Sequence, residues 1–508
     1  MNLRIGFALA ALVLAASSAN AKWYEATSRH FNVYSQQSPE DLLAYASKLE
    51  RYDSAVRAVR KMADPANAHD RLTVYVVKDG ETIERLYGAP GSGVLGFWQS
   101  RAAGPVAFAN SQPKRARYDL DGQTVFFHEY LHHMMLQDAV KTYPTWMSEG
   151  YAEFFAPTEF HDDGSVEIGK PPQYRGWELH NVQGMPLVDM LGGIYNQTTY
   201  REWVSQYGRG WLLTHYLAFE PSRQGQIDRY VNAINSGVPA LDAAKQAFGD
   251  LKKLDKELNA YLARKTIPTR TIPASLIKVG PVDVRPLRDD EAEAVEASMW
   301  LDANDDVGVA RAAAGRARKA AQQFPSSAIV LSTLARAEFE AKHYSEASAA
   351  ADRALAIDPK SLQASVYKGR ALMELAKDNP ASANWQAIRG WFSKANHIDP
   401  EAPEPLMLYF QSFVKQGVKP PAQAVDGLLA AIEDSPRDVD MRLMAVLELV
   451  KEGETKTAQL LYGPVAYDPH SGKEHRRGLE IMEKIKSGDT AGAISMLEED
   501  QKKREKNA

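Results

Sequence analysis

The second half of the chain repeats one helical pattern, and this repetition constrains the fold more than any other sequence feature. Alanine-rich stretches with helical apolar spacing end at recurring prolines, namely Pro325, Pro359, Pro400, Pro436 and Pro469. The intervals between them are 34, 41, 36 and 33 residues, and the longest contains additional residues at 377–384. Because a single helix pair cannot bury its own apolar face, a unit of this length predicts a stack of helix pairs.

The repeated unit resembles the tetratricopeptide repeat, a helix–turn–helix of about 34 residues that closes with a proline. Its best copy spans residues 326–359, where Ala347, Ala351 and Ala354 are small enough to let two helices pack closely. The resemblance implies an all-α solenoid over residues 289–508 that binds a protein partner on its surface. The alternative is a helical bundle in which the prolines recur by coincidence.

The preceding part, residues 22–265, mixes strand and helix patterns and predicts a separate α+β domain. Strand patterns lie near Phe31 and at residues 71–77 and 104–110. Residues 38–61 begin with Ser-Pro-Glu-Asp, which is typical of a helix N-terminus, and continue with helical apolar spacing.

A proline-rich segment lies between the two parts. It contains Pro268, Pro273, Pro281 and Pro286, and prolines at this density exclude a long helix. We therefore expect residues 266–288 to form an extended linker.

The first 21 residues have the composition of a secretory signal. Arg4 precedes an apolar run at residues 5–16, and Ala19 and Ala21 form a small-residue cleavage site. An uncleaved membrane anchor is the alternative, but this run is shorter than the roughly 20 residues that span a bilayer. We expect residues 1–21 to be removed, which would leave a periplasmic or secreted protein without a stable membrane span.

Composition narrows the possible chemistry. The formal net charge is -5, which provides no electrostatic argument for binding nucleic acid. The chain has no cysteine, so a thiol nucleophile, a disulfide and a thiolate metal ligand are all excluded. Any bound metal ion must therefore be held by His, Asp and Glu side chains.

The segment His128-Glu129-Tyr130-Leu131-His132 lies in an apolar stretch without Gly or Pro that predicts a helix. Two histidines four residues apart lie on one helix face and can bind one zinc ion. Glu129 beside them can take a proton from a water molecule at the metal. The alternative is two surface histidines on an amphipathic helix.

A second segment, Trp146 to Glu153 (WMSEGYAE), begins fourteen residues after His132 and predicts another helix. A catalytic zinc ion takes three protein ligands and one water, so Glu149 would complete a His₂Glu set. Glu153 lies one turn further along the same face, where it could accept a hydrogen bond from a ligating histidine and orient its ring. Without a metal ion, these glutamates would form an ordinary solvated helix face.

Together, HEYLH and W-x-x-E-G-x-A resemble the zinc site of the gluzincin metallopeptidases, the group that includes the aminopeptidase N family. They are also similar to bacterial peptidase-MA-like domains that occur with tetratricopeptide repeats. The resemblance covers roughly residues 31–263 and implies a thermolysin-like α+β zinc peptidase domain. Residue by residue, it implies Glu129 as general base, Glu153 as the partner of a ligating histidine, and, as Zn²⁺ ligands, His128, His132 and Glu149.

The aminopeptidase group also has a Y-x-K-G segment whose tyrosine hydroxyl stabilises the oxyanion. This chain has Tyr207-Gly208-Arg209-Gly210, in which arginine replaces the lysine. The resemblance therefore implies Tyr207 as oxyanion donor. His215 and Tyr216 are alternatives, and Tyr207 could instead be an aromatic residue at a helix end.

This chain departs more clearly from the aminopeptidase pattern at the substrate strand. Their G-x-M-E-N strand carries a glutamate that binds the free amino group of the substrate, whereas residues 104–110 of this chain read GPVAFAN and contain no acid. We expect this strand to pair with an extended peptide through its backbone, with Gly104, Ala107 and Asn110 in the lining. An endopeptidase or a narrow-specificity peptidase is therefore favoured over an aminopeptidase.

These features predict a zinc peptidase with a peptide or protein substrate and a repeat domain that recruits the substrate or another protein. Two alternatives stay open. One is a non-catalytic binding scaffold whose peptidase-like domain is stabilised by zinc, and the other is a zinc hydrolase that acts on a non-peptide amide or a cell-wall fragment.

Overall fold

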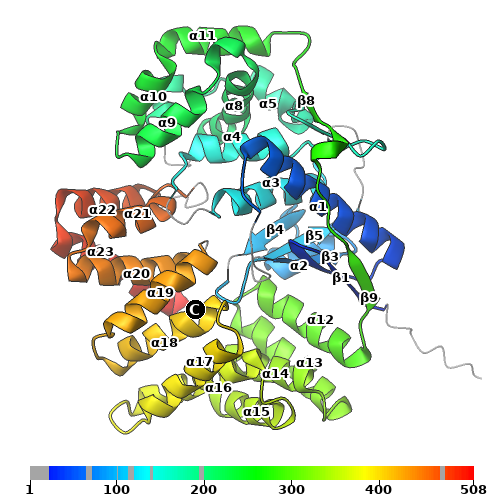
Figure 1. Ribbon diagram of the computed structural model, residues 1–508, viewed down its shortest axis with the longest axis vertical. Coiled ribbons are helices and arrows are strands. Elements are labelled where there is room, and N and C mark those ends of the chain that lie inside the picture. Colours follow the sequence, from blue (N-terminus) through cyan, green and yellow to red (C-terminus); the bar gives the residue numbers. More distant parts are fainter. Residues whose placement is uncertain are drawn as a thin grey trace, which may run out of the picture.

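The computed structural model describes residues 22–64, 71–99, 101–112, 119–137, 141–193, 199–436, 438–468 and 475–507. An N-terminal α+β part and a C-terminal helical part are both present (Figure 1). The predicted signal peptide, residues 1–21, lies outside the described residues. Within them, no helix combines the length and the hydropathy needed to cross a membrane.

The N-terminal part contains a six-stranded sheet with the order β4-β5-β3-β2-β1-β9. β2, β3 and β5 are parallel neighbours, whereas β4, β1 and β9 are joined to them by antiparallel pairs. The strands are β1 (Tyr24–Thr27), β2 (Phe31–Ser35), β3 (Leu72–Val77), β4 (Gly96–Gln99), β5 (Val106–Asn110) and β9 (Asp283–Pro286). The three strand predictions near Phe31, at 71–77 and at 104–110 are confirmed.

Alternate residues of the sheet belong to different cores, as the two-residue period of a strand requires. On β5, Ala107 and Ala109 pack in the core that contains α1 (Pro39–Arg60) and α3 (Gly122–Met135). The intervening Val106 and Phe108 pack in a second core on the opposite face. The helix predicted over residues 38–61 is confirmed as α1, whose N-cap Ser38 accepts a hydrogen bond from the Asp41 backbone N–H at 3.1 Å.

The remaining elements of this part are mostly short helices. They are α2 (Gly80–Tyr87), α4 (Thr145–Phe155), β6 (Glu159–Phe160), β7 (Val166–Ile168), η2 (Gln173–Arg175), α5 (Gly176–Asn181), α6 (Leu187–Leu191), α7 (Tyr200–Val204), η3 (Ser205–Arg209), α8 (Gly210–Phe219), η4 (Pro221–Arg223), α9 (Gln226–Asn235), α10 (Ala240–Phe248) and α11 (Leu251–Leu262). α4 packs against α3 and α8, so these three helices lie together beside the sheet (Figure 1).

The segment predicted as a linker is extended, but it is not a free connection. β8 (Arg270–Ile272) pairs with β7 in a small three-stranded sheet, and η5 (Ala274–Leu276) follows it. β9 then pairs with β1 at the edge of the large sheet. The prediction of a separate linker over residues 266–288 is therefore corrected, because its backbone hydrogen bonds complete the sheets of the N-terminal part.

The C-terminal part is an array of antiparallel helices that follow one another as pairs. They are α12 (Asp289–Ala303), α13 (Val307–Gln323), α14 (Ala328–Glu340), α15 (Tyr344–Ile357), α16 (Leu362–Leu375), η6 (Ala376–Asp378), α17 (Trp385–Ile398), α18 (Pro403–Gln416), α19 (Ala422–Asp434), α20 (Val439–Glu452), α21 (Thr455–Ala466), α22 (His475–Ser487) and α23 (Thr490–Asn507). Pro325, Pro359, Pro400 and Pro436 each lie between one pair and the next, as predicted, whereas Pro469 lies outside the described residues. The result is a solenoid-like array that curves beneath the sheet (Figure 1).

The two parts share a hydrophobic core. Met299 and Ala303 of α12 pack with Tyr75 and Phe108 on the second face of the large sheet. The Tyr75 hydroxyl donates a hydrogen bond to Asp302 at 2.9 Å. The first helix of the solenoid is thus also a layer of the N-terminal fold.

Candidate metal site

Two helices bring the predicted metal ligands together. Asp121 caps α3 by accepting a hydrogen bond from the Thr124 backbone N–H at 2.6 Å. His128 and His132 lie one turn apart on this helix, and their Nε2 atoms are 3.2 Å from each other. The predicted helix is therefore confirmed, and it presents both imidazoles on one face.

Glu149 of α4 completes the cluster. Its side chain is fully buried, and its Oε2 atom lies 3.2 Å from His128 Nε2 and 3.7 Å from His132 Nε2. One nitrogen or oxygen atom from each of the three residues lies within 4.8 Å of the others. Two imidazole nitrogens and one carboxylate are a donor set that suits a divalent metal ion such as zinc.

A close helix crossing sets the position of Glu149. A Cβ atom on the neighbouring Gly150 would lie 2.4 Å from the Gly210 carbonyl oxygen at the start of α8. Only glycine at position 150 allows α4 to approach α8 this closely. The glycine of the WMSEGYAE segment therefore has a packing role next to the ligand.

Electrostatic coupling within the cluster is strong. Burial by itself would lower the pKa of His128, but the hydrogen bond and the negative charge of Glu149 raise it to about 9. Without a metal ion, this raised pKa favours the protonated form of His128 at neutral pH. Since a ligating histidine must be neutral, metal binding at neutral pH releases this proton.

Glu153 lies where the sequence predicts it. The side chain is buried, and its Oε1 atom is 3.7 Å from His128 Nδ1. It accepts hydrogen bonds from the Tyr174 hydroxyl at 2.7 Å and from Arg175 Nη2 at 2.8 Å and Nε at 3.1 Å.

Sequence reasoning missed three neighbours of the cluster. Tyr174 and Arg175 belong to no recognisable motif, and tertiary contacts connect them to the site: both donate to Glu153, and Arg175 also lies over the Tyr207 ring. Ser148 was also missed, although its Oγ atom lies 3.1 Å from His132 Nδ1. The only available signal was its place directly before Glu149 in the second motif.

The structure also brings Glu129 and Tyr207 to the cluster. Glu129 is half-buried, and its negative charge helps to raise the pKa of both His128 and Tyr207. The Tyr207 ring stacks on the His128 ring, with a centroid distance of 5.9 Å and an interplanar angle of 15°. Burial raises the pKa of Tyr207 well above its usual value, so its hydroxyl is protonated and able to donate a hydrogen bond.

Tyr207 lies in the π-helical turn η3, which joins α7 to α8 in one continuous helix. It is therefore not a residue at a helix end. The two alternative donors have other partners. His215 contacts the Tyr261 hydroxyl at 2.9 Å and the Gly169 carbonyl at 2.8 Å, and Tyr216 donates to Glu257.

The prediction of a substrate strand at residues 104–110 is wrong for β5. This strand lies between β3 and β4, so its backbone groups on both sides are paired within the sheet. Ala107 is buried, Asn110 donates a side-chain hydrogen bond to the Leu95 carbonyl at 2.7 Å, and Gly104 precedes the strand in a loop. On this side the sheet ends with the edge strand β4, which contacts the metal-site helix α3.

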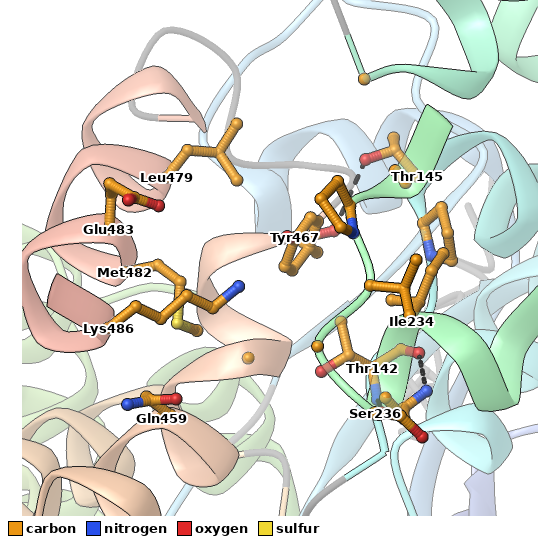
Figure 2. Close-up of a pocket in the computed structure, with 18 of the residues that line it drawn as sticks. Thr142, Thr145, Ile234, Ser236, Gln459, Tyr467, Leu479, Met482, Glu483 and Lys486 are labelled. Atoms are coloured by element: carbon orange, nitrogen blue, oxygen red, sulfur yellow. Dashed lines mark hydrogen bonds between the residues drawn. The ribbon is translucent and has the colours of Figure 1, made fainter. Parts of the chain in front are cut away.

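A cavity of about 530 Å³ lies between the two parts of the molecule, next to the start of α4. Figure 2 shows Leu479, Met482 and Lys486 on one wall, and Thr142 and Ile234 on the other. None of the predicted metal ligands lines it. The candidate site is therefore distinguished by its chemistry and not by the size of a cavity.

Comparisons with known proteins give a family match for one segment and a similar solved structure. Residues 124–238, which contain the whole candidate site, match a family model described as "Protein of unknown function (DUF1570)". No curated protein matches the chain. Among solved structures, the chain is similar to a thermophilic TPR protein from Thermus thermophilus, with 14% identity and a TM-score of 0.32 over 38% of this chain and 97% of that one.

Proposed function

We propose that this protein is a zinc-dependent peptidase. The observation that carries the proposal is the convergence of His128, His132 and Glu149 within 4.8 Å, with Glu129 beside them on α3. When bound, zinc supplies a Lewis acid and lowers the pKa of a water molecule. A merely structural zinc site has no need of the adjacent Glu129.

The residues around the cluster have distinct roles in this mechanism. Glu129 takes a proton from the attacking water and passes it to the leaving amine. The Tyr207 hydroxyl donates a hydrogen bond to the oxygen on which negative charge develops. Glu153 holds the ring of His128 through its Nδ1 side.

An extended peptide is the substrate class that we favour. β4 is an edge strand next to α3, and an edge strand can pair with the backbone of an added peptide. This role replaces the one predicted for residues 104–110. The helix pairs of the C-terminal part would bind the substrate or another protein, and the protein would act in the periplasm or outside the cell.

A binding scaffold is the second candidate, because stacked helix pairs form extended protein-binding surfaces. Metal analysis and hydrolysis together separate it from the enzyme. Glu129→Gln should retain one zinc ion per chain but lose about 10²–10⁴-fold in hydrolysis, since the proton acceptor is removed. His132→Ala should lose both zinc and activity.

Mass spectrometry of new protein termini, after incubation with a cell-envelope protein extract, provides the assay. If Glu129→Gln generates the same termini at the wild-type rate, the mechanism is wrong. A wild-type protein that binds a partner but hydrolyses nothing, whether it is metal-free or holds zinc, would support the scaffold. Cleavage of glycan-linked amides alone would support a non-peptide substrate.

A further inference from the structure

Arg175 contacts two residues next to the candidate metal site, Glu153 and Tyr207. It is the last residue of η2, and its side chain is 12% exposed. Nη2 and Nε both donate to Oε1 of Glu153, at 2.8 Å and 3.1 Å. The same guanidinium lies 4.8 Å from the ring centroid of Tyr207 and 4.5 Å from that of Trp203.

The contact of Arg175 with Glu153 restricts the orientation of the His128 ring, one of the predicted zinc ligands. Tyr174 donates to the second oxygen of Glu153, so the donors of Tyr174 and Arg175 engage both carboxylate oxygens. A carboxylate held in this way has a defined position beside His128 Nδ1. Because partners of this kind orient a ligating ring, their loss typically weakens metal binding about 10–100-fold.

The contact of Arg175 with two aromatic rings restricts the position of Tyr207, the predicted oxyanion donor. The rings of His128, Tyr207 and Trp203 follow one another with centroid distances of 5.9 Å and 4.9 Å. Arg175 covers both Tyr207 and Trp203, and a guanidinium stacks on aromatic rings in a way that a lysine ammonium does not reproduce.

We propose that Arg175 is a positioning residue that holds His128, through Glu153, and Tyr207 in their relative orientation. This inference rests on the proposed function, but it concerns residues that no motif connects to the site. It predicts that one substitution weakens zinc binding and also lowers turnover when zinc is saturating.

The test compares Arg175→Met and Arg175→Lys with a matched control, Arg223→Met. Arg223 is similarly buried, at 11% exposed, and pairs with Glu257, which is not a residue of the cluster. Zinc affinity is measured by competition with a chromophoric chelator, and folding by urea unfolding. Arg175→Met should raise the zinc Kd about 10–100-fold, Arg175→Lys should recover part of this loss, and Arg223→Met should leave the zinc Kd unchanged.

A second measurement tests the contact between Arg175 and Tyr207. With zinc at saturation, Arg175→Met should lower kcat on a cleaved peptide with little change in KM. If Arg175→Met binds zinc as tightly as the wild type, or if Arg223→Met weakens zinc binding equally, the positioning role is wrong.

Failure of the proposed function gives a different result. A wild-type protein that binds zinc but hydrolyses nothing contradicts the peptidase, while the chelator measurement still decides the role of Arg175. A wild-type protein that binds no zinc overturns both.

Discussion

Single residues behind the metal-site helix form a charged network that extends from the core to the half-exposed Asp64. His30 Nδ1 lies 2.8 Å from Glu50, and His30 Nε2 lies 2.7 Å from Asp64. Next to this pair, Asp53 accepts a hydrogen bond at 2.8 Å from the hydroxyl of Tyr130, the central residue of HEYLH. The network therefore anchors the side of α3 that faces away from the predicted metal ligands.

Titration of this network predicts a pH-dependent stability. Burial by itself would lower the pKa of His30, but Glu50 and the other carboxylates raise it above 6.5. Burial would likewise raise the pKa of Glu50, but the hydrogen bond and the charge of His30 lower it below 4.5. The contribution of His30 to the free energy of unfolding is complete below about pH 6.5 and is lost as the pH rises through its folded-state pKa. The contribution of Glu50 is lost as the pH falls below about 4.5.

We therefore expect the ion pair to stabilise the fold most between about pH 4.5 and 6.5. Urea unfolding of wild type and His30→Gln, measured across this range and on into alkaline pH, tests the effect. A difference in unfolding free energy that does not decrease above pH 7 would contradict this account.

Tyr207 provides a second residue-scale prediction. Tyr207→Phe should keep zinc and lower turnover by about 10²–10³-fold, because a donor to the developing negative charge is removed. Tyr216→Phe is the matched control, since the Tyr216 hydroxyl donates to Glu257 instead. Equal effects of the two substitutions on kcat would remove Tyr207 from the mechanism.

At the scale of elements, the crossing of α4 with α8 links folding to the site. The crossing depends on two glycines that leave no room for a Cβ, since one added at Gly150 or Gly210 would lie within about 2.5 Å of backbone atoms. Glu149 directly precedes Gly150, so any displacement of α4 also moves a predicted ligand.

Gly150→Ala should destabilise the protein by about 1–3 kcal/mol, because the added methyl group overpacks the crossing. Gly315→Ala in α13 is the control, because a Cβ at that position meets nothing within 4 Å. That change should stabilise its helix by about 0.5–1 kcal/mol. Denaturant unfolding measures both, and a Gly150→Ala protein as stable as the wild type would show that the crossing can relax.

At the scale of the whole molecule, the solenoid contacts the N-terminal part at both of its ends. α12 covers the second face of the large sheet, and Arg101 donates to the Asp302 carbonyl at 2.9 Å and 3.1 Å. At the other end, the Thr145 hydroxyl at the start of α4 donates a hydrogen bond to the Tyr467 carbonyl at 3.5 Å, and α21 and α22 line the adjacent cavity (Figure 2). The helical repeats are thus part of the structure that supports the candidate site.

A chain that ends at residue 288 should consequently expose the apolar sheet face around Tyr75 and Phe108. We expect it to bind a hydrophobic dye and to unfold at a lower denaturant concentration than the full chain. A chain that ends at residue 468 keeps α12 and should bind less dye. If the shorter chain is as stable and as free of dye as the longer one, the two parts fold independently.

Local periodicity explains what could be predicted. His128 and His132 share a face because they are four residues apart on a helix, and helix-pair boundaries fall at Pro325 and Pro359 because proline ends a helix. These relations involve neighbours in the chain, so the sequence by itself determined the helix pairs, the α+β character of the N-terminal part and the candidate ligands.

Only the tertiary structure decided the remaining features, since they depend on contacts between distant segments. The side-chain alternation of β5 would be the same at the edge of a sheet as in its interior. In the structure β5 is paired on both sides, which leaves β4 as the edge strand next to it. The segment that contains β9 has the composition of a linker but becomes a strand because β1 offers an unpaired edge. Arg175 joins the site for the same reason: packing brings its guanidinium to Glu153.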